Sequence, residues 1–190
     1  MALILASASP RRRELLRVAG IDFVIEPADL PEVPLPNEGP REFAERMARE
    51  KAGAVFRKQT GSAAMVLAAD TVVFVNGTIL NKPEDEQDAA RMLRLISGRC
   101  HQVITGVCLK TAAIEDVRSE TTTVYVRELN EAQIREYIAS GEPMDKAGAY
   151  GIQGIASRWI PRIEGCYFNV VGLPVALVWQ MLKENGGCGN

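Results

Sequence analysis

The sequence predicts an α/β fold in which helices flank a mixed, twisted sheet. Short apolar runs that suit strands buried on both faces, at residues 3–6 and 65–69, alternate with stretches of helical periodicity. Asn76-Gly77 separates two strand-like segments and predicts a hairpin with a type I′ turn. The chain has 190 residues and neither an internal repeat nor a linker that divides it. We therefore expect one domain over residues 1–190, with residues 186–190 as a frayed tail.

The first strand, at residues 3–6, is expected to lead directly into a helix. Ser9 is a favourable N-cap, Pro10 a favourable first helical residue and Gly20 a suitable stop. After a short strand-like stretch, five prolines fall between residues 27 and 40. Proline at this density excludes regular structure and predicts a stiff, extended loop.

The rest of the chain continues the alternation of helices and strands. A helix is expected to begin at Pro40, because apolar residues recur on one face from Phe43 to Val55. The strand at residues 65–69 then runs into Asp70, and the predicted hairpin follows at residues 71–80. A helix at 84–97 comes next, followed by paired strands at 101–111 and 119–127. A further helix begins with a capping box of Asn130 and Gln133 and ends at Gly141. The last elements are a glycine-rich loop at 145–154, a strand-like stretch through Val170 and Val171, and a helix from Pro174 to Lys183.

The composition excludes several classes of protein. Lys and Arg number 22 and Asp and Glu 24, and the resulting net charge of −2 argues against a nucleic-acid or anionic-membrane partner. The four cysteines show no C-x-x-C spacing and the single histidine has no second imidazole to share a metal, so structural zinc is not expected. No apolar run approaches the length of a membrane span, and no signal sequence is recognised. We expect a soluble, cytoplasmic protein.

The turn after the first strand carries a cluster of positive charge. Arg11, Arg12 and Arg13 fall in the first turn of the predicted helix, where the helix dipole disfavours cations. A bound anion would compensate, and Ser7 and Ser9 would add hydroxyl donors. The segment is therefore a candidate phosphate site, with a solvated basic turn as the alternative.

Asp70 and two lysines form a second group of candidates. A carboxylate in so apolar a strand is costly to bury unless it is paired or binds a metal, so we expect Asp70 at the rim of the sheet, facing cations. The alternative for Asp70 is a strand-end residue that caps a turn. Lys51 borders the apolar stripe of its helix and either joins a site or extends to solvent. Lys82 follows the hairpin strand that returns towards Asp70.

Two loops supply further candidates. Glu32 lies in the proline-rich loop, a stiff arm that suits a carboxylate beside a metal, although acidic residues in loops are more often only solvated. In the loop at 145–154 the glycine spacing permits close backbone approach to a ligand. The amide of Gln153 has a donor and an acceptor that match the imide edge of uracil or thymine. A plain surface loop is the alternative for this segment.

Together and in this order, these segments closely resemble the Maf family of nucleotide pyrophosphatases. The resemblance rests on residues 3–12, Ala69-Asp70-Thr71, Asn81-Lys82-Pro83, Leu95-Ile96-Ser97-Gly98 and Val171-Gly172-Leu173-Pro174. It implies a homodimer with an α/β fold like that of the inosine-triphosphate pyrophosphatases. It also implies hydrolysis of a nucleoside triphosphate to the monophosphate and pyrophosphate, a house-cleaning activity that depends on a divalent cation, Mg²⁺ or Mn²⁺. The loop at 145–154 resembles the branch that acts on dTTP and UTP rather than the branch that acts on 7-methyl-GTP.

The resemblance further implies roles for individual residues. Asp70 would be the catalytic carboxylate, described in the family as a proton acceptor. Arg11, Thr71 and Gln153 would be tied to base choice, while Ser7, Arg12, Glu32, Lys51 and Lys82 would line the phosphate and metal site. Because an aspartate is a weak base at neutral pH, we expect Asp70 to act mainly by holding, with Glu32, the metal whose bound water attacks the α-phosphorus.

Other functions remain open at the level of sequence. The family is associated with septum inhibition, so the chain is alternatively a nucleotide-sensing regulator of cell division that binds triphosphate without turnover. A pyrophosphatase of the 7-methyl-GTP branch is a second alternative. A single-stranded nucleic-acid binder is disfavoured by the net charge of −2 and by an aromatic content of 6%. Pyrophosphate release from a panel of nucleotides separates these interpretations.

Overall fold

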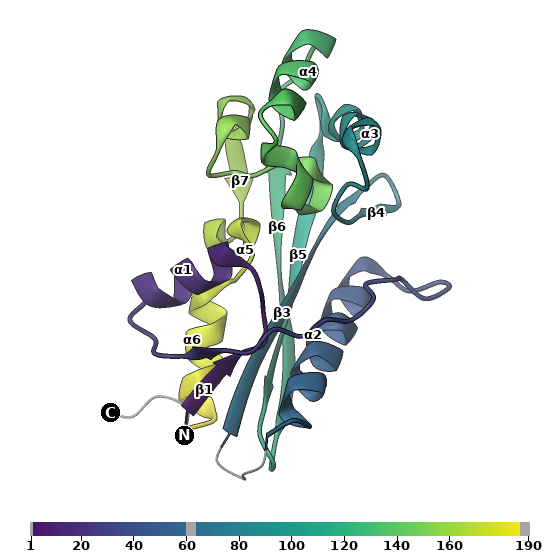
Figure 1. Cartoon of the computed structure of the whole chain (residues 1–190). Coiled ribbons are helices and arrows are strands. Elements are labelled where there is room, and N and C mark those ends of the chain that lie inside the picture. The colour runs from purple at the N-terminus through teal and green to yellow at the C-terminus, as the bar shows by residue number, and fades with distance from the viewer. Residues whose placement is uncertain (1, 60–63, 187–190) are drawn as a thin grey trace. The chain divides into compact units, whose positions relative to one another are not determined.

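A computed structural model of the protein describes residues 2–59 and 64–186 (Figure 1). Its helices and strands are β1 (Ala2–Leu5), α1 (Pro10–Val18), β2 (Val24–Ile25), α2 (Pro40–Phe56), β3 (Ala64–Val75), β4 (Thr78–Leu80), α3 (Glu86–Ile96), β5 (Cys100–Lys110), β6 (Glu115–Tyr125), α4 (Glu131–Ala139), β7 (Arg162–Glu164), α5 (Tyr167–Val171) and α6 (Val175–Glu184). Three 3₁₀ turns lie between α4 and β7: η1 (Glu142–Asp145), η2 (Ala147–Ala149) and η3 (Ile155–Trp159). Residues 187–190, most of the expected frayed tail, lie outside the described part of the chain.

The described strands form one mixed sheet of seven, which confirms the predicted α/β fold. The order is β2-β1-β3-β5-β6-β7, and β4 pairs with β3 outside this path. β1 is parallel to both β2 and β3, with Leu3 opposite Met65, whereas β4 and β7 run antiparallel to their neighbours. Asn76 and Gly77 have φ values of 50° and 78°, as the predicted type I′ turn requires.

The chain divides into two compact units. Unit 1 comprises Met1–Thr71, Thr105–Glu120 and Gly172–Asn190, and unit 2 comprises Val72–Ile104 and Thr121–Val171. The boundaries fall inside β3, β5 and β6, so each of these strands contributes residues to both units. The expectation of a single domain over residues 1–190 stays a prediction.

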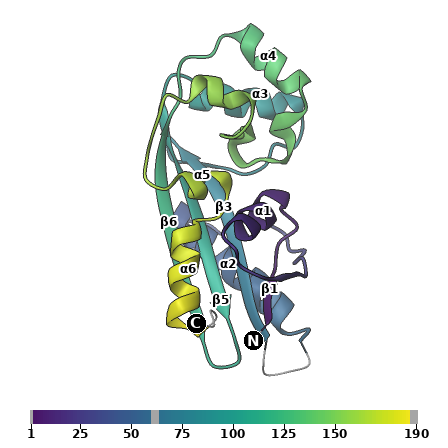
Figure 2. The ribbon, with the colours of Figure 1, turned by 90° about the vertical axis from the view of Figure 1, so that its left-hand side faces the viewer.

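Unit 1 packs helices on both faces of its strands. Figures 1 and 2 show α2 on one face, with α1 and α6 on the other. Small apolar side chains form the contact between α2 and the strands, including Ala48 and Ala52 against Val66. α1 begins as predicted, with Pro10 in its first turn and Ser9 accepting a hydrogen bond from Arg12 N. This capped turn places the start of α1 directly after β1.

Unit 2 has a hydrophobic core of its own, formed largely by α3 and α4 together with buried residues of β3, β5 and β6. Leu93, Ile134 and Tyr137 are almost fully buried in it, next to Val124. The capping box of Asn130 and Gln133 at the start of α4 is present as predicted. Asn169 donates to Val103 O and Thr122 Oγ1, and so ties α5 to β5 and β6 within this unit.

Two expectations about the elements were wrong. Asp70 does not end a strand at the rim of the sheet, because β3 runs without interruption from residue 64 to 75 with Asp70 near its middle. Val170 and Val171 lie in the short helix α5 rather than in a strand. Both errors have a tertiary cause, since the partners of Asp70 and Asn169 are distant in sequence.

None of the described helices is both long enough and apolar enough to cross a membrane.

Candidate active site

A buried ion pair connects the middle of β3 to α2. Asp70 is 5% exposed and Lys51 is 6% exposed, and Lys51 Nζ donates to Asp70 Oδ1 at 2.5 Å. Burial of either charge alone would cost several kcal/mol, on the order of 3–5 kcal/mol, so each side chain requires the other. Lys51 therefore does not extend to solvent, and Asp70 faces a cation as the sequence predicted.

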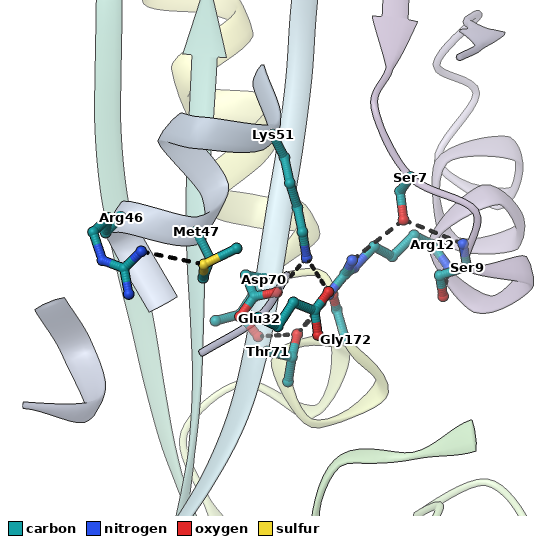
Figure 3. A network of polar contacts seen from close by, with 11 residues as sticks. Ser7, Ser9, Arg12, Glu32, Arg46, Met47, Lys51, Asp70, Thr71 and Gly172 are labelled. Atoms are coloured by element: carbon teal, nitrogen blue, oxygen red, sulfur yellow. Dashed lines mark hydrogen bonds and ion pairs between the residues drawn. The ribbon is translucent and has the colours of Figure 1, made fainter. Parts of the chain in front are cut away.

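The proline-rich segment brings a second carboxylate to the same lysine. Glu32 Oε1 lies 2.6 Å from Lys51 Nζ, so Glu32 and Asp70 share one ammonium group (Figure 3). Glu32 is 19 residues away from Lys51 in sequence and lies in a segment without regular secondary structure. The two carboxylates thus converge from a loop and a strand on a single positive charge.

Arg12 links the start of α1 to β3 and to the segment before α6. Its Nη2 donates to Thr71 Oγ1 at 2.9 Å, its Nη1 to Ser7 Oγ at 3.2 Å and its Nε to Gly172 O at 2.8 Å. Burial lowers the pKa of Arg12, while the negative charges of Asp70 and Glu32 act in the opposite direction. An arginine remains protonated under such shifts, so Arg12 is a fixed positive charge beside the two carboxylates.

Ser7 lies at the point where β1 meets α1. Its Oγ accepts hydrogen bonds from Arg12 Nη1 and from Ser9 N, at 3.2 Å each. Because Oγ is the acceptor in both, the hydroxyl can still donate its own proton to an anion. Arg11 is partly exposed on the first turn of α1, whereas Arg13 donates to the carbonyl of Ala8 at 2.7 Å. The predicted basic cluster thus contains one arginine directed to the site, Arg12, and one directed to the turn backbone, Arg13.

The Thr71 hydroxyl is held by protein groups. Besides Arg12, it lies 3.0 Å from Thr105 Oγ1 and 3.3 Å from Gly172 O. These contacts make Thr71 an organiser of the Arg12 position, and its tie to base choice stays a prediction. Sequence reasoning missed Thr105 and the Gly172 carbonyl. No sequence signal distinguished them, because Thr105 is one of several threonines in the predicted strands and a main-chain oxygen has no side-chain signature.

Lys82 and Gln153 belong to unit 2. Lys82 is exposed just after β4, and Gln153 is exposed in the turn at residues 151–154. Ser7, Arg12, Glu32, Lys51 and Asp70 are brought together within unit 1. That Lys82 and Gln153 complete the same site stays a prediction.

The carboxylates of Glu32 and Asp70 fit a divalent cation that binds together with a polyphosphate. Both place an oxygen on one positive group, Lys51 Nζ, so two carboxylate oxygens converge on one positive charge. Within the described residues no group of three or more His, Cys, Asp or Glu side chains is arranged to hold a metal by itself. Mg²⁺ is commonly held by one or two carboxylates, with substrate phosphates and waters as the other ligands. A pair of converging carboxylates suits Mg²⁺ or Mn²⁺ with further ligands from elsewhere, and metal binding by this chain stays a prediction.

Comparison with known proteins identifies similar chains across the whole length. A family model described as "Maf-like protein" matches residues 2–185. A protein of Koribacter versatilis (strain Ellin345), named dTTP/UTP pyrophosphatase, is 55% identical over 186 residues that cover 98% of this chain and 95% of the relative. Proteins of the same name are 54% identical in Syntrophomonas wolfei subsp. wolfei (strain DSM 2245B / Goettingen), covering 96% of each chain, and 46% identical in Geobacter sp. (strain M21), covering 100% of this chain and 98% of the relative.

Proposed function

The chain belongs to the Maf family, and from this premise we propose that it is a nucleoside triphosphate pyrophosphatase that hydrolyses dTTP and UTP to the monophosphate and pyrophosphate. The name shared by relatives that are 46–55% identical over nearly the whole chain supports this activity. The single structural observation that carries it is the group formed by buried Asp70 and Lys51 with half-buried Glu32, beside Arg12. Two carboxylates and two cations in one place suit a metal–triphosphate complex.

The reaction joins a water oxygen to the α-phosphorus and breaks the bond from that phosphorus to the oxygen bridging it to the β-phosphorus. Charge accumulates on phosphate oxygens during this step, so fixed positive groups lower the barrier. Arg12, the Ser7 hydroxyl and the amides at the start of α1 are placed to neutralise that charge. Their mutual hydrogen bonds hold them in position before substrate arrives.

We propose that Glu32 and Asp70 hold a divalent cation when the triphosphate binds. Bound Mg²⁺ or Mn²⁺ would neutralise phosphate charge and lower the pKa of a coordinated water. Lys51 orients both carboxylates, because its ammonium donates to one oxygen of each. Asp70 would then hold the metal and orient the water, rather than act as a free general base.

We propose that the Gln153 side chain selects the base of the substrate. The amide of an exposed glutamine can donate to a carbonyl and accept from the imide N–H of thymine or uracil. Cytosine reverses this pattern at the same edge, so a fixed glutamine discriminates against it. Gln153→Ala is expected to narrow the difference between dTTP and dCTP more than it slows hydrolysis of dTTP.

A nucleotide panel tests the proposed function. Pyrophosphate release is measured with dTTP, UTP, dCTP, GTP and 7-methyl-GTP in the presence of Mg²⁺, for the wild-type chain and for Gln153→Ala. We expect dTTP and UTP to be the best substrates of the wild type. A preference for 7-methyl-GTP would place the chain in that branch, and binding of dTTP without any pyrophosphate release would favour a sensor.

We further propose that the chain forms a homodimer through an exposed apolar edge of unit 1. β2 is at the edge of the sheet order and exposes Val24 and Ile25, with Val18 exposed nearby in sequence, so this part of unit 1 offers apolar surface to a second copy. Light scattering is expected to give twice the 20.7 kDa of one chain.

The thiols of Cys100, Cys108 and Cys166 suit the reducing cytoplasm. The near-zero net charge supports the absence of nucleic-acid binding, which retention on oligonucleotide resin at low salt would contradict.

A further inference from the structure

The backbone around Gln153 forms a closed turn in unit 2. Gly154 N donates to Gly151 O at 3.1 Å, which closes the four residues 151–154 into one turn with the Gln153 side chain exposed. An amide that reads a base edge must have a fixed position, because a mobile side chain adapts to either hydrogen-bonding pattern. The contacts that fix this turn therefore bear on base preference.

Two side chains from outside the turn bind the amides that flank it. Gly151 N donates to Tyr137 Oη at 3.1 Å, and Ile155 N donates to Glu142 Oε2 at 3.0 Å. Tyr137 Oη in turn donates to Glu142 Oε1 at 2.8 Å. Tyr137 lies in α4 and Glu142 begins η1, so the two ends of the turn are joined through one tyrosine–glutamate pair.

The glycines of the turn permit this close approach. A Cβ atom added at Gly154 would lie 2.1 Å from Glu142 Oε1, and one added at Gly151 would lie 2.7 Å from Lys146 Cε. Lys146 Nζ donates to the Glu142 carbonyl at 2.6 Å, so that side chain is also held against the same residue. The turn thus rests directly on Glu142, with no room for a side chain between them.

The direction of each hydrogen bond requires these two residue types. Glu142 accepts with both oxygens, while the Tyr137 hydroxyl donates to Glu142 and accepts from Gly151 N. Burial and the bond to Glu142 raise the pKa of Tyr137, so the phenol keeps its proton at neutral pH. A glutamine at position 142 has an acceptor oxygen at only one of these two positions and a donor nitrogen at the other, so one of the two hydrogen bonds is lost unless the side chains move.

We propose that Tyr137 and Glu142 are positioning residues for base selection, which fix the turn at 151–154 and thereby hold the Gln153 amide in the orientation that distinguishes an imide base from cytosine. This inference rests on the proposed function, since it assigns the support of the base-reading group in that same reaction. Neither residue contacts the substrate in this proposal, and each acts through the turn backbone.

The test compares two variants that remove the hydroxyl or one acceptor oxygen. Tyr137→Phe keeps the ring in the core, where it packs edge-on against Trp159 with 5.5 Å between centroids, and removes only the hydroxyl. Glu142→Gln keeps the size of the side chain and removes one acceptor. Steady-state kinetics with dTTP and dCTP are measured for both, for the double variant, and for Gln153→Ala.

The expected result is a weaker preference for dTTP over dCTP, with little change in kcat. For each single variant the ratio of kcat/KM for dTTP to that for dCTP falls about fivefold to tenfold, mainly through a higher KM for dTTP, with kcat within about twofold of wild type. The double variant falls no further than the single variants, because both remove the same support. Matched controls are Glu128→Gln and Tyr167→Phe, which change exposed residues of the same types in unit 2 and are expected to leave the ratio unchanged.

The outcomes separate this inference from the function on which it rests. A wild-type chain that hydrolyses neither dTTP nor UTP would overturn both. A wild-type chain that hydrolyses them, with Gln153→Ala losing preference while folded Tyr137→Phe and Glu142→Gln keep it, would overturn the positioning role alone. Gly154→Ala supplies a further variant should the hydroxyl deletion prevent folding, because it displaces the turn from Glu142 without changing either positioning residue. An unchanged ratio in folded Gly154→Ala would also contradict the proposal.

Discussion

Lys51 determines how the acidic groups of the site behave before substrate binds. Its ammonium is buried between Asp70 and Glu32, so each of the three charges depends on the others. Removal of one partner from a buried pair typically costs about 3–5 kcal/mol, because the remaining charge is left without compensation. We expect that a cation bound with the triphosphate would take over this compensation, so that its binding would be coupled to the position of Lys51.

Asp70→Asn is expected to lower pyrophosphate release from dTTP by at least about a hundredfold, because the variant loses the charge that we propose holds the metal and orients water. Triphosphate binding should persist, since Arg12, Ser7 and the start of α1 are unchanged. Initial rates and calorimetric binding of a non-hydrolysable dTTP analogue measure the two effects. Asp22→Asn, at an exposed position of unit 1, is the control, and retained turnover in Asp70→Asn would remove Asp70 from catalysis.

Glu32→Gln is expected to raise the Mg²⁺ concentration for half-maximal activity about tenfold or more, because one of two carboxylate ligands loses its charge. Mn²⁺ binding in the presence of a non-hydrolysable dTTP analogue, followed by electron paramagnetic resonance, gives a readout independent of turnover. Asp29→Asn changes an exposed acid of the same segment and should leave the metal requirement unaltered. An identical metal dependence in Glu32→Gln would show that Glu32 is not a ligand.

For individual helices, the sequence predicts where the element begins whenever the contact that fixes its start joins residues that are close in sequence. Ser9 and Pro10 predict the start of α1, and the pair of Asn130 and Gln133 predicts the start of α4, because each cap binds a backbone amide within three residues. The course of β3 through Asp70 could not be predicted, since its compensating charge comes from α2. Val170 and Val171 lie in the same short helix as Asn169, whose amide binds β5 and β6, and no local pattern reveals such distant contacts.

Close packing of α2 against β5 yields a prediction for stability. A Cβ atom at Gly106 would lie 2.3 Å from the carbonyl oxygen of Ala44 and 2.6 Å from the amide nitrogen of Glu45, both in the backbone of α2. Gly106→Ala should therefore push α2 outward and lower the free energy of unfolding by about 1–3 kcal/mol. Because α2 carries Lys51, activity should fall as well.

Urea unfolding and initial rates measure both effects of Gly106→Ala. The matched control is Gly53→Ala in α2 itself, where the added Cβ would meet only the end of the Arg57 side chain at 3.4 Å. That change should be neutral or stabilising, because alanine favours a helix over glycine by about 1 kcal/mol. Equal stabilities for Gly106→Ala and wild type would show that α2 is not fixed by this contact.

At the scale of the whole molecule, the single histidine gives the stability a predictable dependence on pH. His101 is buried, its Nε2 lies 2.7 Å from Tyr150 Oη, and burial lowers its pKa from 6.5 to about 4. The unfolded chain binds a proton near pH 6.5 that the folded chain does not, so stability is lost as the pH falls below this value. The loss should amount to about 1.5 kcal/mol between pH 6.5 and pH 5.

Urea unfolding at pH 7.5, 6.5, 5.75 and 5 measures this slope. His101→Gln should flatten it over the same interval, even though the variant is less stable at every pH. A wild-type stability that is constant from pH 6.5 to pH 5 would contradict a neutral, buried His101 in the folded chain.

The family was predicted from the resemblance of several motifs, and the structure brings Ser7, Arg12, Glu32, Lys51 and Asp70 of the predicted site together in unit 1, while their roles stay predictions. Sequence reasoning did not reach Thr105 or the Gly172 carbonyl, since a threonine in a strand and a main-chain oxygen carry no distinctive signal. The order of the strands was also beyond prediction, because pairing between distant segments is set by packing rather than by local pattern. The fold class, by contrast, follows from hydrophobic periodicity alone.

The most direct test of the account is a crystal structure of the protein with Mg²⁺ and a dTTP analogue whose α–β bridge cannot be hydrolysed. We expect the triphosphate to lie against Arg12 and Ser7, with a cation between its oxygens and the carboxylates of Glu32 and Asp70. A triphosphate bound elsewhere, with the Lys51–Asp70 pair unchanged and no cation beside it, would contradict the assignment of this group as the active site.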